Sequence, residues 1–554
     1  MKKPIKFAFV SVYHKTNGLD LIIKKLHELG VSISSTGGTA DFIEVLGVPV
    51  IKAETITGYP SILGGRVKTL HPKIMGAILA RRENEGDIAQ LEEYEIPEID
   101  LVIVDLYPFQ QTVDSGSSHE EIVEKIDIGG ITLIRAAAKN YNDVTIVSSM
   151  EQYPTLLDIL EKQGTEITEE QRYDFATKAF VTTVSYDLAI MMYFGQGDYY
   201  GIIGKKVLSL RYGENPWQEV LGLYKSFGED NPLGLDKLQW LAGDPGYVNV
   251  IDVDRMFQTI THVMAGYHKN LLWQDMGFQK KESLPYVAIG VKHGNPCGAA
   301  INSSDPEQAI KDMLDGNLIS IFGGAIITNF TITKKLAEII RNYHAEKPQR
   351  IIDLVIAPDI DPQAVKILER KDDLCKMAIL HALANLDSDC LDKSILIRKV
   401  AGGFLAQRNY DFFPDLSNDY FKKYGEIRML FGQDRVNLVL GLAICATSNS
   451  NTIVLVKDQM LIGAGVGQKD RLECCDLAVK IAQEAGHTTA GALAVSDSFF
   501  PFPDGPGKLI NAGVKTIFSL SGSVKDQLTI DLCEKTKVML LMIDNKIARM
   551  FFAH

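Results

Sequence analysis

The run "IDLVIVDLYPF", residues 99–109, constrains the fold more than any other segment of the chain. Its unbroken apolar stretch is typical of a strand that is buried on both faces, as in parallel sheets covered by helices. "KFAFVSV", "VSISST" and "DVTIVSS" are also predicted strands, and helical segments such as "GLDLIIKKLHELG" stand between them. This alternation predicts a parallel α/β sheet in about the first 150 residues. Ligands of such sheets bind at the carboxyl ends of the strands.

The chain has 554 residues, enough for two to four domains. The glycine-rich segment "GQGDYYGIIGKK" is a predicted boundary. Beyond it, two segments share one plan, an apolar strand that runs into a Gly/Pro-rich loop: "PYVAIGV" before "KHGNPCGAA", and "AGALAVS" before "DSFFPFPDG". We therefore expect an α/β protein with three parts, at residues 1–200, 201–390 and 391–554, the last two being related lobes.

Composition excludes several classes of function. With 57 Lys and Arg against 70 Asp and Glu, the net charge is −13, which argues against nucleic acid as a main partner. No apolar run reaches membrane-spanning length, and the apolar part of the N-terminal segment is too short for a signal peptide. The seven cysteines are scattered and odd in number, which disfavours a disulfide framework. We expect a cytoplasmic protein without a membrane partner.

Within this acidic chain, residues 64–82, "GGRVKTLHPKIMGAILARR", are rich in Lys and Arg and contain no carboxylate. A second segment, "SSTGGTA", follows a predicted strand and opens a helix, where backbone N–H groups and the helix N-terminus favour an anion. Each segment also has a plain reading, as a solvated basic surface or as an ordinary turn with a Thr cap. Taken together with Lys15, they predict a phosphate-sized site.

Two further segments supply reactive side chains. "DIGGITLIRAAAKN" is a Gly-Gly turn that enters a helix, with Asp127 before the turn and with Arg135 and Lys139 on one helix face. "DLYPF" places Tyr107 at the carboxyl end of the buried strand. The alternatives are a capped helix with surface cations and a tyrosine that only packs.

The segments "GGRVKTLHP", "DLYPF" and "DIGGITLIRAAAKN" resemble the IMP cyclohydrolase domain of the family of bifunctional purine biosynthesis proteins. That domain has a methylglyoxal-synthase-like fold and closes the second purine ring of a formylated aminoimidazole carboxamide ribotide. The resemblance implies that the anion of the basic segment is the ribose 5′-phosphate. It implies ring-closing roles for Lys68, Tyr107, Asp127 and Lys139, and nucleotide binding by Ser11, Lys15, Thr36, Gly37, Gly38, Thr39, Arg66, Thr69 and Asp105.

The first loop departs from the family's pattern. It reads "SVYHKTNG" where the family has a segment like "SVSDKTG", so that Tyr13 and His14 replace a small polar residue and an acid. Asp105 also stands where the family usually has Asn. Both departures concern contacts with the nucleotide rather than the phosphate site.

In the second half, "VKHGNPCGAA" places Lys292 and His293 at the end of a predicted strand, and "SLRYGENPWQ" is rich in hydrogen-bond donors. An isolated Lys-His pair is more often a surface feature than a catalytic one. A zinc deaminase requires His-x-Glu followed by Pro-Cys-x-x-Cys, a pattern that His293 and Cys297 do not complete. We therefore expect no metal site.

These segments resemble the aminoimidazole carboxamide ribotide (AICAR) transformylase half of the same family. The match continues in the family's order through "FGGAIITN", "IIDLVIAPD", "GGFLAQ", "SNTIVLVKD", "GAGVGQKDR" and "SDSFFPFPDGP". The resemblance implies two cytidine-deaminase-like lobes without zinc, 10-formyltetrahydrofolate as formyl donor, and active sites formed across a homodimer. It implies catalysis by Lys292, His293 and Asn451, and binding of nucleotide or folate by Arg211, Tyr212, Asn249, Gly323, Asp353, Phe499, Asp504, Ser521, Arg549 and His554.

The C-terminal end departs from the family, because Arg549 and His554 are five positions apart and the family has four. The expected activity is formyl transfer to AICAR followed by dehydrative ring closure to IMP. Two other readings stay open at this point. In one, only the transformylase works and the first domain is a nucleotide-binding regulatory module; in the other, the chain is a non-catalytic interaction protein.

Overall fold

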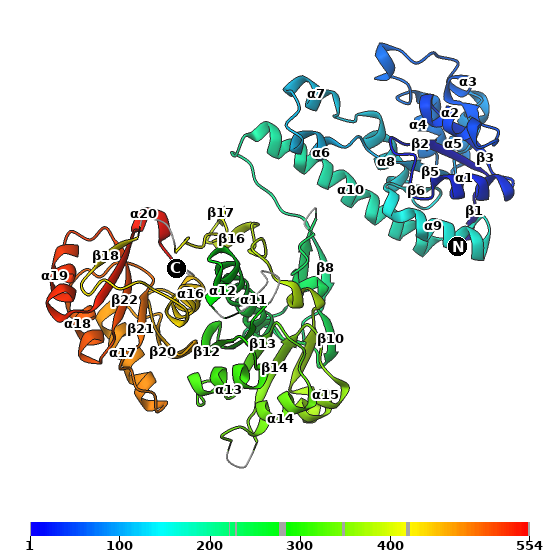
Figure 1. Cartoon of the computed structure of the whole chain (residues 1–554). Coiled ribbons are helices and arrows are strands. Elements are labelled where there is room, and N and C mark those ends of the chain that lie inside the picture. The colour runs from blue at the N-terminus through cyan, green and yellow to red at the C-terminus, as the bar shows by residue number, and fades with distance from the viewer. Residues whose placement is uncertain are drawn as a thin grey trace. The chain divides into compact units, whose positions relative to one another are not determined.

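The computed structural model describes residues 2–220, 222–227, 230–275, 277, 284–345, 349–416 and 421–551. The chain divides into two compact units, Met1–Gly204 and Lys205–His554, which carry the blue-to-cyan and the green-to-red colours of Figure 1. The units are described separately below. The domain boundaries expected at residues 200 and 390 stay predictions.

A five-stranded sheet forms the centre of the first unit. Every neighbouring pair of its strands is parallel, and all four residues of its longest apolar run are buried, as the sequence predicts. A separate antiparallel pair joins β1 (Lys2–Pro4) to β7 (Glu166–Thr168). In their order across the main sheet the strands are β4 (Ile51–Lys52), β3 (Ser32–Ser35), β2 (Phe7–Ser11), β5 (Leu101–Val104) and β6 (Thr145–Val147).

Helices connect these strands and bury their apolar faces against the sheet. The longest of them begins at a capping box, in which the Thr168 hydroxyl accepts the Gln171 N–H and the Gln171 side chain accepts the Thr168 N–H. The helices are α1 (Leu19–Glu28), α2 (Gly37–Val45), α3 (Ala53–Thr57), α4 (Pro72–Leu79), α5 (Glu85–Glu93), α6 (Phe109–Asp114), α7 (His119–Glu124), α8 (Gly129–Lys139), α9 (Tyr153–Gln163) and α10 (Glu169–Gly195), with 3-10 helices Leu63–Gly65 and Met150–Gln152.

The second unit contains one repeated arrangement of strands and helices. The first copy runs β10 (Gln239–Ala242), α11 (Tyr247–Lys269), β11 (Tyr286–Lys292), β12 (Asn295–Asn302), α13 (Pro306–Gly316), β13 (Gly324–Thr328), α14 (Lys334–Asn342), β14 (Ile352–Ala357), α15 (Pro362–Leu368) and β15 (Lys376–Ile379). The second copy runs β18 (Lys422–Tyr424), α16 (Gln433–Ala446), β19 (Thr452–Lys457), β20 (Met460–Val466), α17 (Arg471–Glu484), β21 (Leu493–Ser496), α18 (Asp504–Asn511), β22 (Thr516–Ser521), α19 (Asp526–Thr536) and β23 (Met539–Asp544).

The two copies share one twelve-stranded mixed sheet, in the order β10-β15-β14-β13-β11-β12-β20-β19-β21-β22-β23-β18. This order reads the same from either edge when each strand is exchanged for its counterpart. The central pair, β12 and β20, is antiparallel, so the two copies are related by a pseudo-twofold rotation. The mixed α/β class expected from the sequence is therefore present in both units.

Glycines at matching positions set the packing inside each copy. A Cβ atom at Gly298 of β12 would lie 2.2 Å from the Met313 carbonyl oxygen, and one at Gly463 of β20 would lie 2.3 Å from that of Ala478. The same interval in the chain separates Gly298 from Gly463 and Met313 from Ala478. Only glycine allows these helices to approach the central strands so closely, so the repeat extends to the register of individual residues.

Alternating side chains of the strands point into cores on opposite faces of this sheet. Val287, Ile289 and Val291 of β11 join a core with α11 and α16, whereas Ala288 joins a second core with α13, α14 and α15. A third core lies under α17, α18 and α19. The helices α11 and α16 thus cover one face of both copies, and three helices cover the other face of each.

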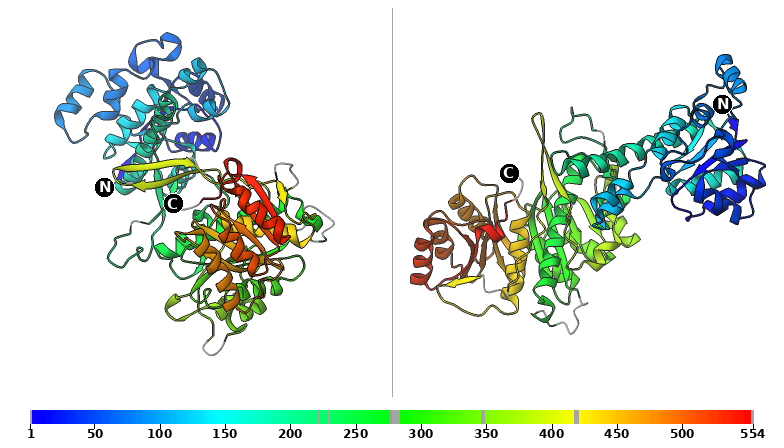
Figure 2. Two further views of the ribbon diagram at one scale, coloured as in Figure 1. Left: turned by 90° about the vertical axis from the view of Figure 1, so that its left-hand side faces the viewer. Right: turned by 90° about the horizontal axis from the view of Figure 1, so that it is seen from above.

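A hairpin of β16 (Ile395–Val400) and β17 (Gly403–Arg408) links the two copies and projects from the second unit (Figure 2, yellow). It exposes several large apolar side chains: Ile395, Leu396, Val400, Phe404 and Leu405. The remaining elements are the antiparallel pair β8 (Gly204–Leu208) and β9 (Leu223–Ser226), the helices α12 (Leu272–Asp275) and α20 (Asn545–Ala548), and the 3-10 helices Leu235–Lys237, Lys371–Asp373 and His381–Asn385.

Candidate active sites

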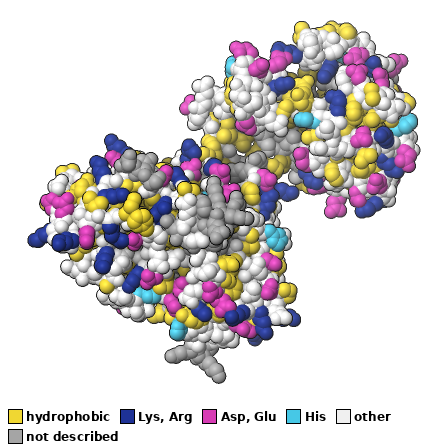
Figure 3. Space-filling model, in the orientation of Figure 1, with side chains coloured by type: hydrophobic (Ala, Val, Ile, Leu, Met, Phe, Trp, Pro, Cys, Tyr) yellow, Lys and Arg dark blue, Asp and Glu magenta, His cyan; other side chains and the backbone are white. Residues whose placement is uncertain are grey.

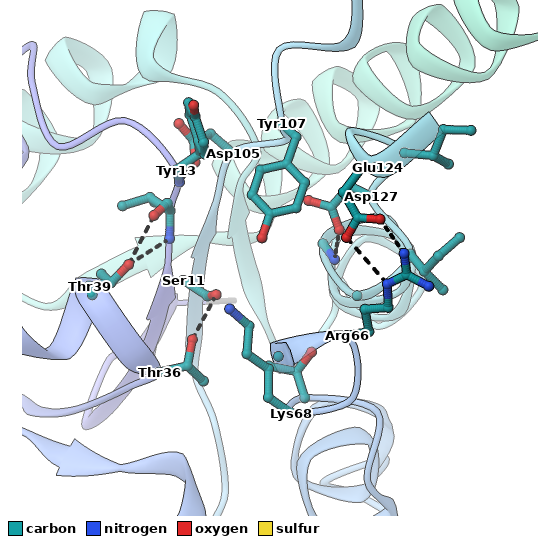
Figure 4. Close-up of a pocket in the computed structure, with 18 of the residues that line it drawn as sticks. Ser11, Tyr13, Thr36, Thr39, Arg66, Lys68, Asp105, Tyr107, Glu124 and Asp127 are labelled. Atoms are coloured by element: carbon teal, nitrogen blue, oxygen red, sulfur yellow. Dashed lines mark hydrogen bonds and ion pairs between the residues drawn. The ribbon is translucent and has the colours of Figure 1, made fainter. Parts of the chain in front are cut away.

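A pocket of about 650 Å³ opens in the first unit where β2, β3 and β5 end. It is lined by residues that the sequence singled out from five separate segments, which shows that the fold brings these segments together. Figure 4 shows side chains from these segments directed into one space. The lining residues include Ser11, Lys15, Thr36, Gly38, Thr39, Arg66, Lys68, Thr69, Asp105, Tyr107 and Asp127.

One end of this pocket is built to hold an anion. The helix α2 begins there at Gly37, and Thr36 does not cap it through its side chain. Instead the Thr36 hydroxyl lies 3.2 Å from that of Ser11, and a Cβ at Gly38 would lie 3.9 Å from Lys15 Nζ. An open helix N-terminus, an ammonium group and two hydroxyls are together suited to bind a phosphate.

Thr39 has a different role from Thr36. Its hydroxyl accepts the Val12 N–H at 3.2 Å and donates to the Val12 carbonyl at 2.9 Å. Both bonds attach α2 to the loop after β2, so the hydroxyl of Thr39 holds the backbone of the pocket.

The other end of the pocket contains Lys68, Tyr107 and Asp127. The Asp127 carboxylate accepts the Gly130 N–H at 2.6 Å, and a Cβ at Gly130 would lie 2.6 Å from that carboxylate. Glycine at position 130 therefore allows α8 to begin in contact with the Asp127 side chain, where a larger residue would collide with it. In Figure 4 the Tyr107 hydroxyl and the Lys68 ammonium point toward the same space.

Electrostatics distinguish the two acids of this group. Burial raises the pKa of Asp127, against the opposing effects of the Gly130 and Tyr107 N–H groups and of Lys68. Burial also raises the pKa of Tyr107, and the nearby Asp127 carboxylate adds to the shift. Asp127 is therefore a stronger base than an ordinary carboxylate, and Tyr107 is a phenol that stays protonated and can donate.

Arg66 is not free in this pocket. Its guanidinium forms an ion pair with Glu124, a residue that the sequence did not single out, and both side chains are largely exposed. The Arg66 Nε also donates to Glu124 at 3.3 Å. The predicted contact between Arg66 and a nucleotide would therefore replace an existing ion pair.

The two departures from the family's pattern, His14 and Asp105, are bonded to each other. Asp105 is buried and accepts the backbone N–H groups of Tyr13 and His14, and His14 Nδ1 lies 2.8 Å from its carboxylate. These three contacts fix the first loop. The His14 side chain and the Asp105 carboxylate are hydrogen-bond partners, so the two replacements interact directly.

Several contacts at this site could not be predicted from the sequence. Tyr13 packs its ring edge-on against Tyr107, with ring centroids 5.3 Å apart, and the Lys125 ammonium lies 5.4 Å from the Tyr13 ring centroid. The Tyr186 hydroxyl of α10 accepts the Asp127 N–H at 2.9 Å and donates to the Lys125 carbonyl at 2.6 Å. The apolar periodicity of α10 gave no sign of this contact.

Lys139 is the one predicted cyclohydrolase residue that lies away from this group. It stands exposed at the last position of α8, whereas the pocket meets the first turn of that helix. Eleven residues of helix span about 16 Å. The catalytic role of Lys139 and the contact of Gly37 with a ligand both stay predictions.

The second candidate site lies along one edge of the large sheet, where β11 ends and β12 begins. Lys292 Nζ donates to the Phe322 carbonyl at 2.6 Å. His293 is exposed and, with Gly294, forms the two-residue turn of the hairpin at φ values of 52° and 68°. Because β11 ends at Lys292 and His293 belongs to the turn, the alternation of side chains along a strand does not force these two residues onto opposite faces.

The same edge receives the start of β19 from the second copy. The Asn295 side chain donates to the His293 carbonyl at 3.1 Å and accepts the Asn449 N–H at 3.2 Å. Asn451 follows two residues later, and its side chain donates to the Gln468 carbonyl at 2.9 Å. One asparagine thus ties the predicted catalytic turn to the segment that carries Asn451.

The predicted nucleotide residues of the first copy lie near this turn. The Tyr212 hydroxyl donates to Asn249 Oδ1 at 3.0 Å, and that oxygen also accepts the Gly246 N–H. Arg211 donates its N–H to the Pro245 carbonyl. A Cβ at Gly323 would lie 3.9 Å from Asp353 Oδ2, and Asp353 forms an ion pair with Arg370 at 2.6 Å.

The predicted residues of the second copy follow strands further along the sheet. Phe499 and Asp504 come after β21, Ser521 ends β22, and Arg549 follows α20 with its Nε donating to Asn545 at 2.9 Å. His554 lies outside the described residues. Seven strand spacings separate β14 from β22, about 33 Å. Asp353 and Ser521 of one chain therefore cannot both contact one nucleotide.

A larger cavity of the second unit, about 820 Å³, lies elsewhere. It is lined by residues such as Asp254, His262, Asp392 and Tyr410, and it contains none of the residues predicted for formyl transfer. All seven cysteines are free thiols. Among the residues that the structure describes, no cluster of His, Cys, Asp and Glu is placed to hold a metal ion, and no helix is long and apolar enough to cross a membrane.

Lys and Arg side chains are mixed with Asp and Glu side chains over the face shown in Figure 3. The cations of the first pocket, Lys15, Arg66 and Lys68, stand beside the carboxylates of Asp105, Glu124 and Asp127, so the anion site is a local feature rather than part of a wide basic surface.

The chain is similar to known proteins over almost its whole length. Residues 18–132 match the model of the MGS-like domain, and residues 137–481 match that of the AICARFT/IMPCHase bienzyme. A protein of Bacteroides thetaiotaomicron described as bifunctional purine biosynthesis protein PurH is 41% identical over 96% of this chain and 96% of its own length. Proteins with the same description from Cutibacterium acnes and Acetivibrio thermocellus are 35% and 34% identical, each over 97% of this chain and 98% of their own length.

One solved structure, described as the crystal structure of ForH, is 36% identical and has a TM-score of 0.31, covering 34% of this chain and 100% of that one. The family matches and the full-length relatives lead to a single conclusion: this chain belongs to the AICARFT/IMPCHase bienzyme family.

Proposed function

We propose that this chain catalyses the last two steps of IMP synthesis at two separate sites, formyl transfer to AICAR in the second unit and ring closure in the first. Membership of the bienzyme family supports both activities. The observation that carries the assignment of ring closure is the first pocket. It joins an anion site of Lys15 and the α2 N-terminus to a base, Asp127, and two donors, Lys68 and Tyr107.

For ring closure, the ribose 5′-phosphate binds at Lys15, Ser11 and Thr36, and the formylated carboxamide extends toward Asp127. The carboxamide nitrogen attacks the formyl carbon, a C–N bond forms, and Asp127 takes the proton from that nitrogen. Lys68 and Tyr107 donate to the former formyl oxygen in the tetrahedral adduct. When its C–O bond breaks, this oxygen leaves as water, the former formamide nitrogen loses its proton, and a C=N bond forms in the new ring. Thr69 and Gly38 complete the proposed nucleotide contacts, and Thr39 supports them by holding the loop after β2. The role of Lys139, at the far end of α8, stays a prediction.

For formyl transfer, the amine of AICAR attacks the formyl carbon of a folate-derived donor, which we propose to be 10-formyltetrahydrofolate. His293 takes the amine proton, and Lys292 and Asn451 donate to the tetrahedral oxyanion. The bond from the formyl carbon to the folate nitrogen then breaks, and that nitrogen is protonated. The amine is conjugated with the ring carboxamide, so a positioned base is needed.

We propose that the chain acts as a homodimer, and the spacing of the predicted binding residues supports this. The residues near β13 and β14 and those after β21 and β22 lie too far apart in one chain to hold one pair of substrates. A second copy would bring one group against the other, and the apolar hairpin of β16 and β17 offers surface for such an interface. We further propose a cytoplasmic enzyme with two lobes at residues 201–390 and 391–554.

Two single variants test the division of labour. Lys68→Ala is expected to abolish ring closure of the purified formylated nucleotide and to leave formyl transfer unchanged. His293→Ala is expected to do the reverse. If either variant impaired both reactions equally when each intermediate is supplied directly, the assignment of one reaction to each unit would be wrong.

A further inference from the structure

The repeat in the second unit provides an internal comparison for the predicted catalytic turn. In the first copy the turn consists of His293 and Gly294, and in the second copy it consists of Asp458 and Gln459, at nearly the same φ values of 50° and 65°. The strand residue before each turn is a lysine, Lys292 or Lys457. Lys292 donates to a carbonyl of the loop before β13, and Lys457 donates to a carbonyl of the loop before β21. The two turns are thus built alike.

The covering helix holds each turn by the same hydrogen bond. Asp252 of α11 accepts the Gly294 N–H at 2.7 Å, and Asn437 of α16 accepts the Gln459 N–H at 2.7 Å. Both side chains are 8% exposed. An amide oxygen therefore performs the structural task in the second copy, and the negative charge of Asp252 is not required for holding a turn of this kind.

The difference between the copies follows the charge of the turn residue. Where the turn presents His293, the helix presents a carboxylate; where the turn presents Asp458, the helix presents a neutral amide. Burying a carboxyl group without a charged partner is costly, so an acid at position 252 needs a reason beyond one N–H contact. The imidazole opposite it is such a reason.

The surroundings of Asp252 agree with this view. Burial raises its pKa, and the Gly294 N–H, His293 and Arg255 oppose the shift, in that order of size. The other titratable groups that face it are the Asp353 carboxylate from β14 and the Cys297 thiol from β12. The Arg255 guanidinium is directed to the Thr447 carbonyl. In the proposed formyl transfer, the exposed His293 becomes a cation when it takes the amine proton.

We propose that Asp252 is a positioning residue for formyl transfer: it fixes the turn that carries His293 and supplies the negative charge against which that imidazole accepts the amine proton. This inference rests on the proposed role of His293. Asp252 does not contact substrate. It acts through the turn backbone and through its charge, and these two effects can be separated by substitution.

Asp252→Asn is the informative variant, because an amide retains the Gly294 contact, as Asn437 shows, and removes only the charge. We expect kcat for formyl transfer to fall about tenfold, the factor that corresponds to one pKa unit, with KM for AICAR unchanged. The acidic limb of the kcat profile should move to lower pH, because an imidazolium without its counter-charge loses its proton more readily. Asp252→Ala should lower kcat further.

Asn437→Ala is the matched control, since it removes the same helix-to-turn contact from the second copy. It should leave formyl transfer within twofold of the parent. Urea unfolding of the second unit, measured on the same preparations, reports correct folding of each variant, and ring closure by the first unit should be unchanged. The double variant Asp252→Asn with His293→Ala should be no slower than His293→Ala alone, because Asp252 acts through His293.

A parent-like rate and an unmoved acidic limb in Asp252→Asn would overturn the inference, as would an equal loss in Asn437→Ala. A further loss in the His293→Ala background would also overturn it. If His293→Ala itself transferred formyl groups at the parent rate, the proposed role of His293 would fail first, and with it the role of Asp252. The single and double variants therefore distinguish the two failures.

Discussion

Replacing Tyr186 by Phe tests how the first unit holds Asp127, its proposed catalytic base. The Tyr186 hydroxyl accepts the Asp127 N–H at 2.9 Å and donates to the Lys125 carbonyl at 2.6 Å, so that it fixes the backbone on both sides of Ile126. The ring itself packs edge-on against Phe109, with centroids 6.1 Å apart, and this contact survives in the variant. Only the hydroxyl is lost.

Two hydrogen bonds, each worth about 0.5–1.5 kcal/mol net, give a loss of about 2 kcal/mol in the unfolding free energy of the unit. For a unit of this size the melting temperature should fall by about 4–8 °C. A catalytic group displaced by about 1 Å costs up to 100-fold in rate. Because the Asp127 carboxylate keeps the Gly130 N–H, we expect about a tenfold fall in kcat for ring closure.

The assay follows IMP formation from the purified formylated nucleotide, with formyl transfer measured on the same sample. Formyl transfer should be unchanged because Tyr186 belongs to the first unit. The control is Tyr193→Phe, which removes another α10 hydroxyl, bonded at 2.9 Å to His119, a residue that does not line the pocket. If ring closure kept its parent rate while the melting temperature fell as expected, Tyr186 would have no part in positioning Asp127.

Three further predictions concern single residues. Glu124→Gln should lower KM for the formylated nucleotide about two- to fivefold, because it frees Arg66 to contact the nucleotide. Stability should change little, since an exposed ion pair contributes little to it; an unchanged KM would contradict this. Burial raises the pKa of Asp127, so ring closure should be lost as pH falls through a value above the usual 3.9, and Asp127→Asn should lower kcat at least about 100-fold at neutral pH. Gly298→Ala should destabilise the second unit by about 1–3 kcal/mol in urea unfolding, whereas Gly403→Ala, in open space, should not.

Much of the first site could be predicted from the sequence, because its residues stand at the ends of recognisable strands. Tyr107 follows a run buried at every position, and Asp127 precedes a Gly-Gly turn, so each could be placed at the correct edge of the sheet. The same rule could not reveal Tyr186, because it lies in the middle of a long helix. Its part in the site depends on a contact between residues 59 positions apart.

Pairing between distant residues was also beyond the sequence. His14 and Asp105 were each taken as a departure from the family, and only the structure shows that their side chains are hydrogen-bonded across 91 positions. Likewise, two short motifs suggested a repeat in the second half. The correspondence of Asp252 and Asn437 is visible only in the structure, where each accepts a backbone N–H of the equivalent turn. Periodicity identifies the buried face of a helix, whereas the partner of a polar side chain depends on the tertiary fold.

The central claim, that one chain performs both reactions, is tested most directly by a product assay. Purified protein is mixed with AICAR and 10-formyltetrahydrofolate without added metal, and the nucleotides are separated over time. The account predicts that IMP appears, with the formylated intermediate only transient. Accumulation of the formylated intermediate without IMP would contradict it, because Lys68, Tyr107 and Asp127 would then form a binding site that does not catalyse ring closure.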